Sequence, residues 1–450
     1  MLNRKMTRRD FLWLMSISMA ATSCAKNPVT GENQLMLISE AKERQLDRNG
    51  YPQQFAADYG KINDSGLNKY LNEVGQKMAS LSHRPQMPYS FQGVNAIYVN
   101  AYAFPAGTIA MTRGILLSLR SEAELAAVMG HEIGHVNARH TAERMSKKML
   151  MASIVLLGTV SLAAFKKTRI AAPVAGVLGL VGGGALLAHY SRNDEREADA
   201  LGMKYMLKAG HNPTGMVKLM EILKMISGEK PNLIDMMFAS HPMSSERYET
   251  AKKSAEKITK NNKDLPLNRE RYMDNTARLR GIIKTLQLMQ DGEGNMARSQ
   301  FSQAESNFDD ALKLTPEDYA GLMMMTQCQI VQENLDKART YVNQAKTVNP
   351  AEASAYHLSG IVYMMENKFS NAYEEFDDFE NKVPSNANTI FLKGTALEGM
   401  QDKDGAAAEY RRYLKITTKG EAAAHIQQRF SDWGIDFPNK SNLLSVPINN

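Results

Sequence analysis

Residues 121–148 read SEAELAAVMGHEIGHVNARHTAERMSKK, and this stretch decides both the fold class and the chemistry of the chain. Ser121 and Glu124 form a start signal for a helix, because the serine hydroxyl can cap the first turn and the glutamate can reach back to it. Apolar residues at helical spacing follow, and basic residues close the stretch, as suits the negative end of a helix dipole. The pattern predicts a long helix that runs to the basic end of the stretch.

Within this helix, His131 and His135 are four residues apart, so both imidazoles lie on one face and can bind one Zn²⁺ ion. Glu132 lies beside them, where its carboxylate can take a proton from a water molecule at the metal. An H-E-x-x-H pattern predicts this chemistry only in a helical context, and the capped helix supplies that context. A catalytic zinc site also needs a third protein ligand and an open position for water.

A second helical pattern supplies acidic candidates for the third ligand. Residues 190–199 read YSRNDEREAD and continue as ALGMKYMLKAG. Glu195 and Asp199 are four residues apart and share a helix face, so one can bind zinc while the other orients a histidine ligand. Glu197 lies two residues from Asp199 and therefore on another face.

These two motifs, H-E-x-x-H followed by S-R-x-x-E-x-x-x-D, make the sequence similar to the zinc metallopeptidase family that includes HtpX, BepA and the CAAX prenyl proteases. The resemblance covers about residues 27–260. Three further segments carry it: Asn27 to Gly31 (NPVTG), Asn100 to Gly107 (NAYAFPAG) and His241-Pro242 followed by Arg247. Ala106 departs from the glycine that is usual in the second of these segments.

The resemblance implies a zinc endopeptidase with one Zn²⁺ per chain. Its implied site consists of His131, His135 and Glu195 as metal ligands, Glu132 as catalytic base and Asp199 as the residue that orients a ligand. The E-x-x-x-D spacing selects Glu195 over Glu197. His241 keeps two open roles: it can donate a hydrogen bond to the developing oxyanion, or it can occupy the open position on zinc and hold the enzyme latent. A third interpretation is a histidine at a helix start, without chemistry.

The remaining histidines and the cysteines bound the kinds of site that the chain can build. Histidines at positions 83, 140, 189, 211, 357 and 425 fit no ligand spacing, and we expect them to be surface or packing residues. The two cysteines, Cys24 and Cys328, exclude a disulfide framework and a cysteine-based zinc site. A metal site built from histidine and carboxylate ligands therefore remains possible.

Residues 107–113 alternate polar and apolar side chains and are rich in residues that favour strands. The pattern predicts an edge strand just before the histidine helix, with residues 91–99 supplying its neighbour. An edge strand can pair with an extended substrate backbone while demanding little of the substrate sequence. We therefore expect substrate to bind along this strand, at Gly107, Thr108, Ile109, Ala110 and Met111.

Residues 1–23 predict an export signal, because basic residues precede an apolar run that is too short for a permanent membrane anchor. Thr7 to Leu12 (TRRDFL) resembles a twin-arginine signal, and Ala21 to Cys24 (ATSC) resembles a bacterial lipobox, with Ala21 where leucine is usual. The lipobox implies lipidation at Cys24, a tether over residues 24–45 and a periplasmic protein on a lipid anchor. Ala25 after the cysteine favours the outer membrane. The alternative is an ordinary cleaved signal with an incidental cysteine.

Two uncharged apolar runs, residues 149–165 and 170–190, lie between the histidine motif and Glu195. Their length is borderline for membrane helices, and HtpX-like relatives place membrane helices at this point. Pro173 and the glycines at positions 182–184 break the second run. We expect a helical hairpin on the catalytic domain that touches the membrane or a partner, and a true membrane span is the alternative.

The C-terminal part of the sequence repeats with a period of 34 residues. Three sets of positions share this period: Pro316, Pro350 and Pro384; Ala304, Ala338, Ala372 and Ala406; Phe308, Val342, Phe376 and Tyr410. The period is that of tetratricopeptide repeats, in which a small alanine lets paired helices approach and the pairs stack into an α-solenoid. We expect about three and a half repeats over residues 298–419, a linker and joining helix over 262–297, and a capping helix and tail over 420–450.

Composition excludes several other classes. With 43% hydrophobic and 23% charged residues in 450, the chain is neither disordered nor a polytopic membrane protein. The formal net charge of +6 falls to +3 without residues 1–23, because 50 basic and 47 acidic residues remain. No basic–aromatic stripe accompanies that charge, so we expect no nucleic-acid partner.

The sequence therefore predicts an α+β, mostly α chain: a zincin-type metallopeptidase domain over residues 46–261 with a small edge-stranded sheet, followed by an α-solenoid of tetratricopeptide repeats. We expect a zinc endopeptidase of the bacterial envelope that acts on misfolded or misassembled proteins. The repeats would recruit substrates or partners, with the outer-membrane assembly machinery among them. The alternative is a periplasmic chaperone or scaffold that acts mainly through the repeats, with conditional proteolysis. For the repeats themselves, the alternative is an array that only stabilises the chain.

Overall fold

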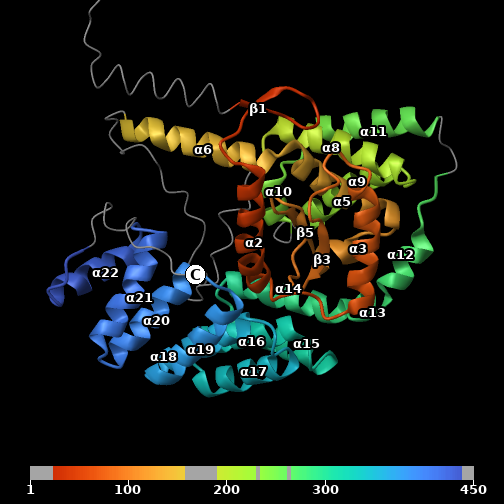
Figure 1. Ribbon diagram of the computed structural model, residues 1–450. Helices are drawn as coiled ribbons and strands as arrows, with labels where there is room; N and C mark the ends of the chain where they lie inside the picture. The colour runs from red at the N-terminus through yellow and green to blue at the C-terminus, as the bar shows by residue number, and fades with distance from the viewer. Residues whose placement is uncertain (1–23, 158–189, 230–233, 261–264, 438–450) are drawn as a thin grey trace, which may run out of the picture.

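The computed structural model describes residues 24–157, 190–229, 234–260 and 265–437, which form an N-terminal α+β domain and a C-terminal array of helices (Figure 1). The N-terminal domain contains β1 (Cys24–Lys26), β2 (Asn33–Leu35), α2 (Glu40–Ala57), α3 (Ser65–Ala79), β3 (Ser90–Val94), β4 (Ala101–Ala103), β5 (Thr108–Thr112), α4 (Arg113–Ser118), α5 (Glu122–Ala138), α6 (His140–Leu157), α8 (Arg192–Lys208), α9 (Thr214–Glu229), α10 (Asp235–Ser240) and α11 (Ser245–Thr259). The export signal predicted over residues 1–23 lies outside the described residues, and lipidation of Cys24 stays a prediction.

The helix pair α5 and α8 forms the centre of the N-terminal domain. The two helices approach closely because glycine faces small residues across the contact. A Cβ atom on Gly134 would stand 2.9 Å from the backbone of Ala198, and one on Gly130 would stand 3.0 Å from Gly202. Both helices also have capped starts: Ser121 accepts from the Glu124 backbone N–H, and Ser191 forms a reciprocal capping box with Asp194.

The single long helix expected over the histidine stretch is in fact two helices. Helix α5 ends at Ala138, and Arg139 adopts a left-handed conformation with φ of 61°. This conformation is uncommon for arginine, and tertiary contacts hold it. The Arg139 guanidinium donates to the Glu43 carboxylate at 3.0 Å and to the Ile38 carbonyl at 2.8 Å. Helix α6 therefore leaves in a new direction, which Figure 1 shows as a helix that projects from the domain.

The sheet has the order β3-β5-β4, with β3 parallel and β4 antiparallel to β5. The predicted edge strand is therefore wrong in its position: β5 lies in the middle and is buried along its length. A turn at Gly107, whose φ is 105°, folds β4 back onto β5 and covers the side that was expected to be free. The neighbouring strand expected over residues 91–99 is β3, which ends at Val94.

Among the described helices, none has the length and apolar character that a bilayer-spanning segment requires. The apolar stretch that raised the question runs from α6 into residues 158–189, which lie outside the described residues. The predicted hairpin and its alternative, a membrane span, therefore both remain predictions.

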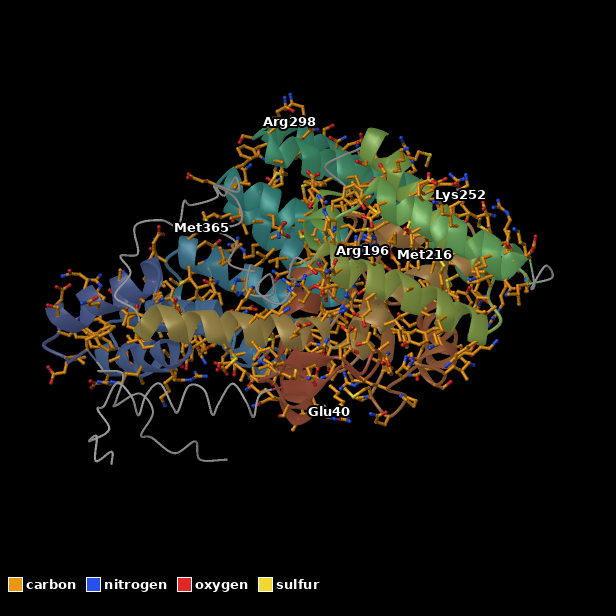
Figure 2. All side chains as sticks on the ribbon, turned by 90° about the horizontal axis from the view of Figure 1, so that it is seen from above. Glu40, Arg196, Met216, Lys252, Arg298 and Met365 are labelled. Carbon is orange, nitrogen blue, oxygen red and sulfur yellow. The ribbon has the colours of Figure 1, made fainter. Side chains whose placement is uncertain are left out.

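The C-terminal array consists of antiparallel helix pairs. It contains α14 (Ile283–Ala297), α15 (Phe301–Leu314), α16 (Tyr319–Val331), α17 (Leu335–Val348), α18 (Ser354–Met365), α19 (Phe369–Lys382), α20 (Ala387–Gly399), α21 (Lys403–Ile416) and α22 (Glu421–Asp432). Two short helices before it, α12 (Arg269–Asn275) and α13 (Ala277–Gly281), pack on the N-terminal domain, where Tyr272 and Leu279 join the apolar core. Helix α14, which was expected as a joining helix, pairs with α15. The boundary of the repeats at residue 298 stays a prediction. In the view from above, Arg298 and Met365 mark two points along the array (Figure 2).

The residues of the 34-residue period form the interior of the array. Ala304, Ala338, Ala372 and Ala406 are fully buried, and so are the large residues four positions later. Phe308, Phe376 and Tyr410 each cover a glycine of the preceding helix, namely Gly292, Gly360 and Gly394. The second pair has Thr326 at the glycine position and the smaller Val342 at the aromatic position. Where the first helix of a pair has the larger Thr326 in place of glycine, the second helix thus has the smaller Val342 in place of an aromatic residue.

The array docks against the N-terminal domain through polar and apolar contacts. Arg113, at the start of α4, pairs with Asp318 at the start of α16 at 2.6 Å, and both side chains are buried. The Gln290 side chain donates to the Ile97 carbonyl at 2.8 Å. On α2, Ala56 packs in an apolar cluster with Ala353, Phe379 and Val383.

Candidate metal centre

Four buried side chains converge in the N-terminal domain. His131 and His135 come from α5, Glu195 comes from the first turn of α8, and His241 directly follows α10. One donor atom from each of the four lies within 4.8 Å of the others. The structure thus brings together the three predicted ligands and adds His241 from a distant part of the chain.

The spacing of these donor atoms fits a zinc ion. Two ligands on a tetrahedral Zn²⁺ with bonds of about 2.0–2.1 Å stand about 3.3–3.4 Å apart. His131 Nε2 lies 3.0 Å from His135 Nε2 and 3.5 Å from Glu195 Oε2. His135 Nε2 lies 3.3 Å from Glu195 Oε1. The set of two imidazoles and a carboxylate also suits zinc chemically, because its donors are nitrogen and oxygen atoms in a buried site.

His241 stands at the distance of a further ligand. Its Nδ1 lies 3.2 Å from His131 Nε2 and 3.0 Å from Glu195 Oε1, which is the spacing of the other donor pairs. Its Nε2 lies 3.7 Å from the Glu132 carboxylate. A histidine in this place can fill the position that a catalytic site keeps open for water.

Glu132 points into the same cluster. Its side chain is buried, and its Oε2 has no hydrogen-bond partner among the described residues. Burial raises the pKa of Glu132, and the nearby His241 and His131 lower it in part. An unsatisfied carboxylate oxygen beside the donor cluster is placed to accept a proton from a water molecule there.

Asp199 contacts the outer nitrogen of His131, as the sequence predicted for one member of the Glu195–Asp199 pair. Its Oδ1 lies 2.9 Å from His131 Nδ1, which leaves Nε2 for a metal. Arg247 donates to Asp199 through Nε at 2.8 Å and lies 2.6 Å from Glu195 Oε2. Burial alone would raise the pKa of Asp199, but the contacts with His131 and Arg247 hold it below its ordinary value.

Comparison with known proteins gives one family match in the N-terminal domain and another in the repeat array. Residues 65–255 match Peptidase family M48, and residues 295–359 match the Tetratricopeptide repeat family. The chain joins an M48 peptidase domain to tetratricopeptide repeats. The M48 match contains α5, α8 and the start of α11, and so spans every residue of the cluster.

Curated relatives extend the match to both domains. The chain is 24% identical to the beta-barrel assembly-enhancing protease of Escherichia coli K12 over 422 residues, which cover 86% of this chain and 83% of that protein. It is 30% identical over 205 residues to a protein of Vibrio cholerae named "Putative beta-barrel assembly-enhancing protease", covering 43% of this chain and 40% of that protein. A mitochondrial metalloendopeptidase of Arabidopsis thaliana is 28% identical over 186 residues, 41% of this chain and 36% of that protein. The chain thus spans less than half the length of the last two relatives.

An apolar pocket adjoins the cluster in the M48 domain. His131, Glu132 and His241 lie at its polar side, and its apolar lining consists of Val128, Met216, Leu219, Met220, Leu223, Met237 and Met243. Met216, which comes from α9 and is buried, is labelled in the view from above (Figure 2). Methionine side chains are flexible and polarisable, so such a lining can adapt to apolar groups of different shapes.

Two residues of the M48 domain were missed by the sequence analysis. His140 was expected at the surface or in packing; it is buried, and nothing in the sequence indicated that its Nδ1 lies 2.9 Å from His135 Nδ1. Glu197, rejected as a ligand, lies 3.3 Å from His140 Nε2. In a continuous helix, residues five apart face different directions, so the spacing rule excluded a contact between His135 and His140. The break in the helix at Arg139 brings His140 to His135, and no pattern in the sequence indicated that break.

Proposed function

We propose that the chain is a zinc-dependent endopeptidase of the bacterial envelope, with His131, His135 and Glu195 as zinc ligands. The observation that carries the proposal is the buried cluster of these donors with Glu132 beside it, whose Oε2 has no hydrogen-bond partner in the part of the chain that the structure describes. The M48 match and the protease names of the relatives support it. A structural metal site would not need an acidic side chain without a partner next to its ligands.

The residues of the cluster have different roles in peptide hydrolysis. Zinc, when bound, supplies a Lewis acid that polarises the peptide carbonyl and lowers the pKa of water. Glu132 accepts the proton of the attacking water and then gives it to the leaving amine. Asp199 fixes the orientation of His131, and Arg247 offsets the buried negative charge of Asp199 and Glu195.

The substrates proposed are misfolded or misassembled envelope proteins. The methionine-lined pocket favours an apolar side chain next to the scissile bond, and unfolded chains expose such side chains. Because β5 is the middle strand, the candidate for pairing with an extended substrate becomes β4, the outer strand that packs against α5. The repeats would recruit the substrate or a partner, and the relatives' name suggests outer-membrane β-barrel assembly as the setting.

The variant Glu132→Gln tests the enzyme proposal. We expect cleavage of an unfolded protein substrate to fall by about 10³-fold, because a general base contributes on the order of 10²–10⁴-fold. Zinc content and the melting temperature should stay at the wild-type values. The matched control is Glu246→Gln, since Glu246 is exposed on α11 and pairs with Arg196. Full cleavage by the Glu132→Gln protein would overturn the mechanism, and full cellular function without cleavage would favour the chaperone or scaffold alternative.

A latent state is the second candidate, and the position of His241 favours it. With Nδ1 at ligand spacing from His131 and Glu195, His241 can close the site until substrate displaces it. We expect His241→Ala to cleave unfolded substrate faster than the wild type. Slower cleavage by this variant would contradict latency and support the other role, a hydrogen bond to the oxyanion.

The location proposed is the periplasmic side of the outer membrane, on a lipid at Cys24. The lipobox at Ala21 to Cys24 supports it. Cys24→Ser should move the protein from the membrane fraction to the soluble periplasmic fraction. A wild-type protein that is already soluble after export would contradict the anchor and leave the ordinary cleaved signal.

A further inference from the structure

His135 stands at one end of a row of polar side chains that reaches the N-terminal segment of the domain. Its Nδ1 lies 2.9 Å from His140 Nδ1, and His140 Nε2 lies 3.3 Å from Glu197 Oε2. Asn27 donates from Nδ2 to the other oxygen of Glu197 at 3.1 Å. The hydrolytic mechanism described above uses neither His140, nor Glu197, nor Asn27.

One proton arrangement satisfies the whole row. A histidine that binds zinc through Nε2 is neutral and carries its proton on Nδ1, so His135 can only donate toward His140. His140 must then accept at Nδ1 and carry its own proton on Nε2. That proton points to Glu197, a carboxylate, which only accepts. The hydrogen bonds of the row are thus all formed when His135 carries its proton on Nδ1, which is the tautomer that binds zinc through Nε2.

The backbone around His140 is held by the same N-terminal segment, residues 27–38. The Gln34 side chain donates to the Ala138 carbonyl at 3.1 Å, and the Leu37 backbone N–H donates to Ser146 Oγ at 2.9 Å. Arg139 donates to the Ile38 carbonyl. These contacts lie on both sides of the break between α5 and α6, which turns His140 back toward His135.

The two histidine ligands of the proposed zinc site are therefore supported differently. His131 is hydrogen-bonded to Asp199, and Asp199 pairs in turn with Arg247 inside the domain. His135 contacts His140, and the row that supports it ends at Asn27, within residues 24–45, the predicted membrane tether.

We propose that His140 is a positioning residue that fixes the tautomer and orientation of His135, that Glu197 holds His140 in place, and that Asn27 makes the N-terminal segment part of this support. The inference rests on the proposed zinc binding by His135. Loss of a group that orients a metal ligand typically weakens metal binding by about 10–100-fold. We expect the effect to decrease along the row, from His140 through Glu197 to Asn27.

The test measures zinc affinity by chelator competition and the visible absorption of the cobalt(II)-substituted protein, both on the full chain. His140→Phe keeps the ring and removes the acceptor, and should lower zinc affinity by about 10–100-fold and shift the cobalt bands. Glu197→Leu should act in the same direction but less, while Glu197→Gln, which keeps an acceptor oxygen, should recover most of the affinity. Asn27→Ala should show the smallest loss. The matched controls are His425→Phe, in the last helix of the array, and Glu246→Leu, on the surface of α11.

The outcomes separate the two proposals. If the wild type binds zinc and the His140, Glu197 and Asn27 variants bind it with unchanged affinity and cobalt spectra, the row has no role in positioning. Equal losses in Glu197→Leu and Glu197→Gln would also contradict it, because a packing role does not distinguish an acceptor from an apolar group. If the wild type itself binds no zinc, the proposed function fails first. Glu197 is partly exposed, so its variants test the row even if His140→Phe does not fold.

Discussion

The helix pair α5 and α8 and the helix pairs of the repeat array use glycine at the point of closest approach in different ways. In the M48 domain, a Cβ on Gly134 would meet the backbone of Ala198 at 2.9 Å, and backbone cannot move aside. In the array, a Cβ on Gly360 would meet the ring of Phe376, which is a side chain. The contact at Gly134 fixes the distance between the two helix backbones. At Gly360, the ring of Phe376 fills the space that a side chain would otherwise occupy.

The buried residues around the two contacts explain the difference. The α5–α8 contact carries His131, His135 and Glu195, whose donor atoms must stay about 3.3–3.4 Å apart to share a zinc ion. The array contacts carry alanine and large apolar or aromatic side chains, which tolerate exchange of volume between partners. The array itself contains such an exchange, with Thr326 and Val342 at the positions of glycine and phenylalanine. The metal centre thus requires a fixed distance between α5 and α8. The array requires only that the two side chains that meet between paired helices keep about the same total volume.

Gly134→Ala should give the largest effect, because it forces apart the two helices that supply the ligands. We expect a loss of about 3 kcal/mol in the free energy of unfolding of the M48 domain, at the upper end for an added methyl group in a packed core. Zinc affinity should fall as well, by roughly 100-fold, because a small shift of a ligand is costly. Chemical denaturation and chelator competition measure the two losses. Unchanged zinc affinity in a destabilised protein would show that the glycine serves packing alone.

Asp318→Asn should separate the two regions without touching either helix contact. Asparagine can still cap α16, but it leaves the buried Arg113 guanidinium without its charged partner. Removing one partner of a buried ion pair costs on the order of 3–5 kcal/mol, and we expect about 3 kcal/mol here. The unfolding curve should split into separate transitions for the peptidase domain and the array, with zinc affinity unchanged. The control is Asp309→Asn, an exposed residue that pairs with Lys313. A single transition at the wild-type midpoint would show that apolar contacts alone dock the array.

The repeat contact is tested by Gly360→Ala, which should cost about 2 kcal/mol because the methyl group meets the Phe376 ring. The double variant Gly360→Ala with Phe376→Leu should recover part of that loss, since the smaller side chain makes room. Zinc affinity should not change in either variant. If the double variant is no more stable than the sum of its two single variants predicts, volume exchange between the paired helices is not the rule in this array.

The parts that the sequence predicted are those that a local pattern encodes. The 34-residue period predicted the solenoid, and the H-E-x-x-H and E-x-x-x-D spacings selected residues that the fold then brought to one place. The two parts that it missed have different causes. Arg139 is left-handed because the distant residues Glu43 and Ile38 hold it, and nothing in the residues nearby indicates this, so His140 was overlooked. The β4–β5 hairpin is local and turns at Gly107, but β4 has only three residues, too few to display an alternating pattern, so β5 was placed at the edge.

The smallest expected effect concerns the interface of the two regions, where Glu352 of the array lies against Gly60 of the M48 side. Burial raises the pKa of Glu352 to about 7, and the charges of Lys61 and Lys382 offset this only in part. The folded protein therefore binds more protons than the unfolded chain between the ordinary glutamate pKa and about 7, so the free energy of unfolding should rise as the pH falls through this window. One unit of pKa difference corresponds to about 1.4 kcal/mol, and the partial exposure of the carboxyl keeps the expected gain near 1 kcal/mol.

Urea denaturation of the full chain at pH 8 and at pH 5.5 measures this gain, and Glu352→Gln isolates it. The amide has no charge to lose, so the variant should be more stable than the wild type at pH 8, and the difference in the free energy of unfolding should be smaller at pH 5.5. Glu366→Gln is unsuitable as a control because Glu366 pairs with Arg339, whereas Glu317→Gln changes a glutamate in the exposed turn before α16. If wild type and Glu352→Gln differ by the same amount at both pH values, protonation of Glu352 does not contribute to docking. The interface would then depend on the Arg113–Asp318 pair and the apolar cluster at Ala56.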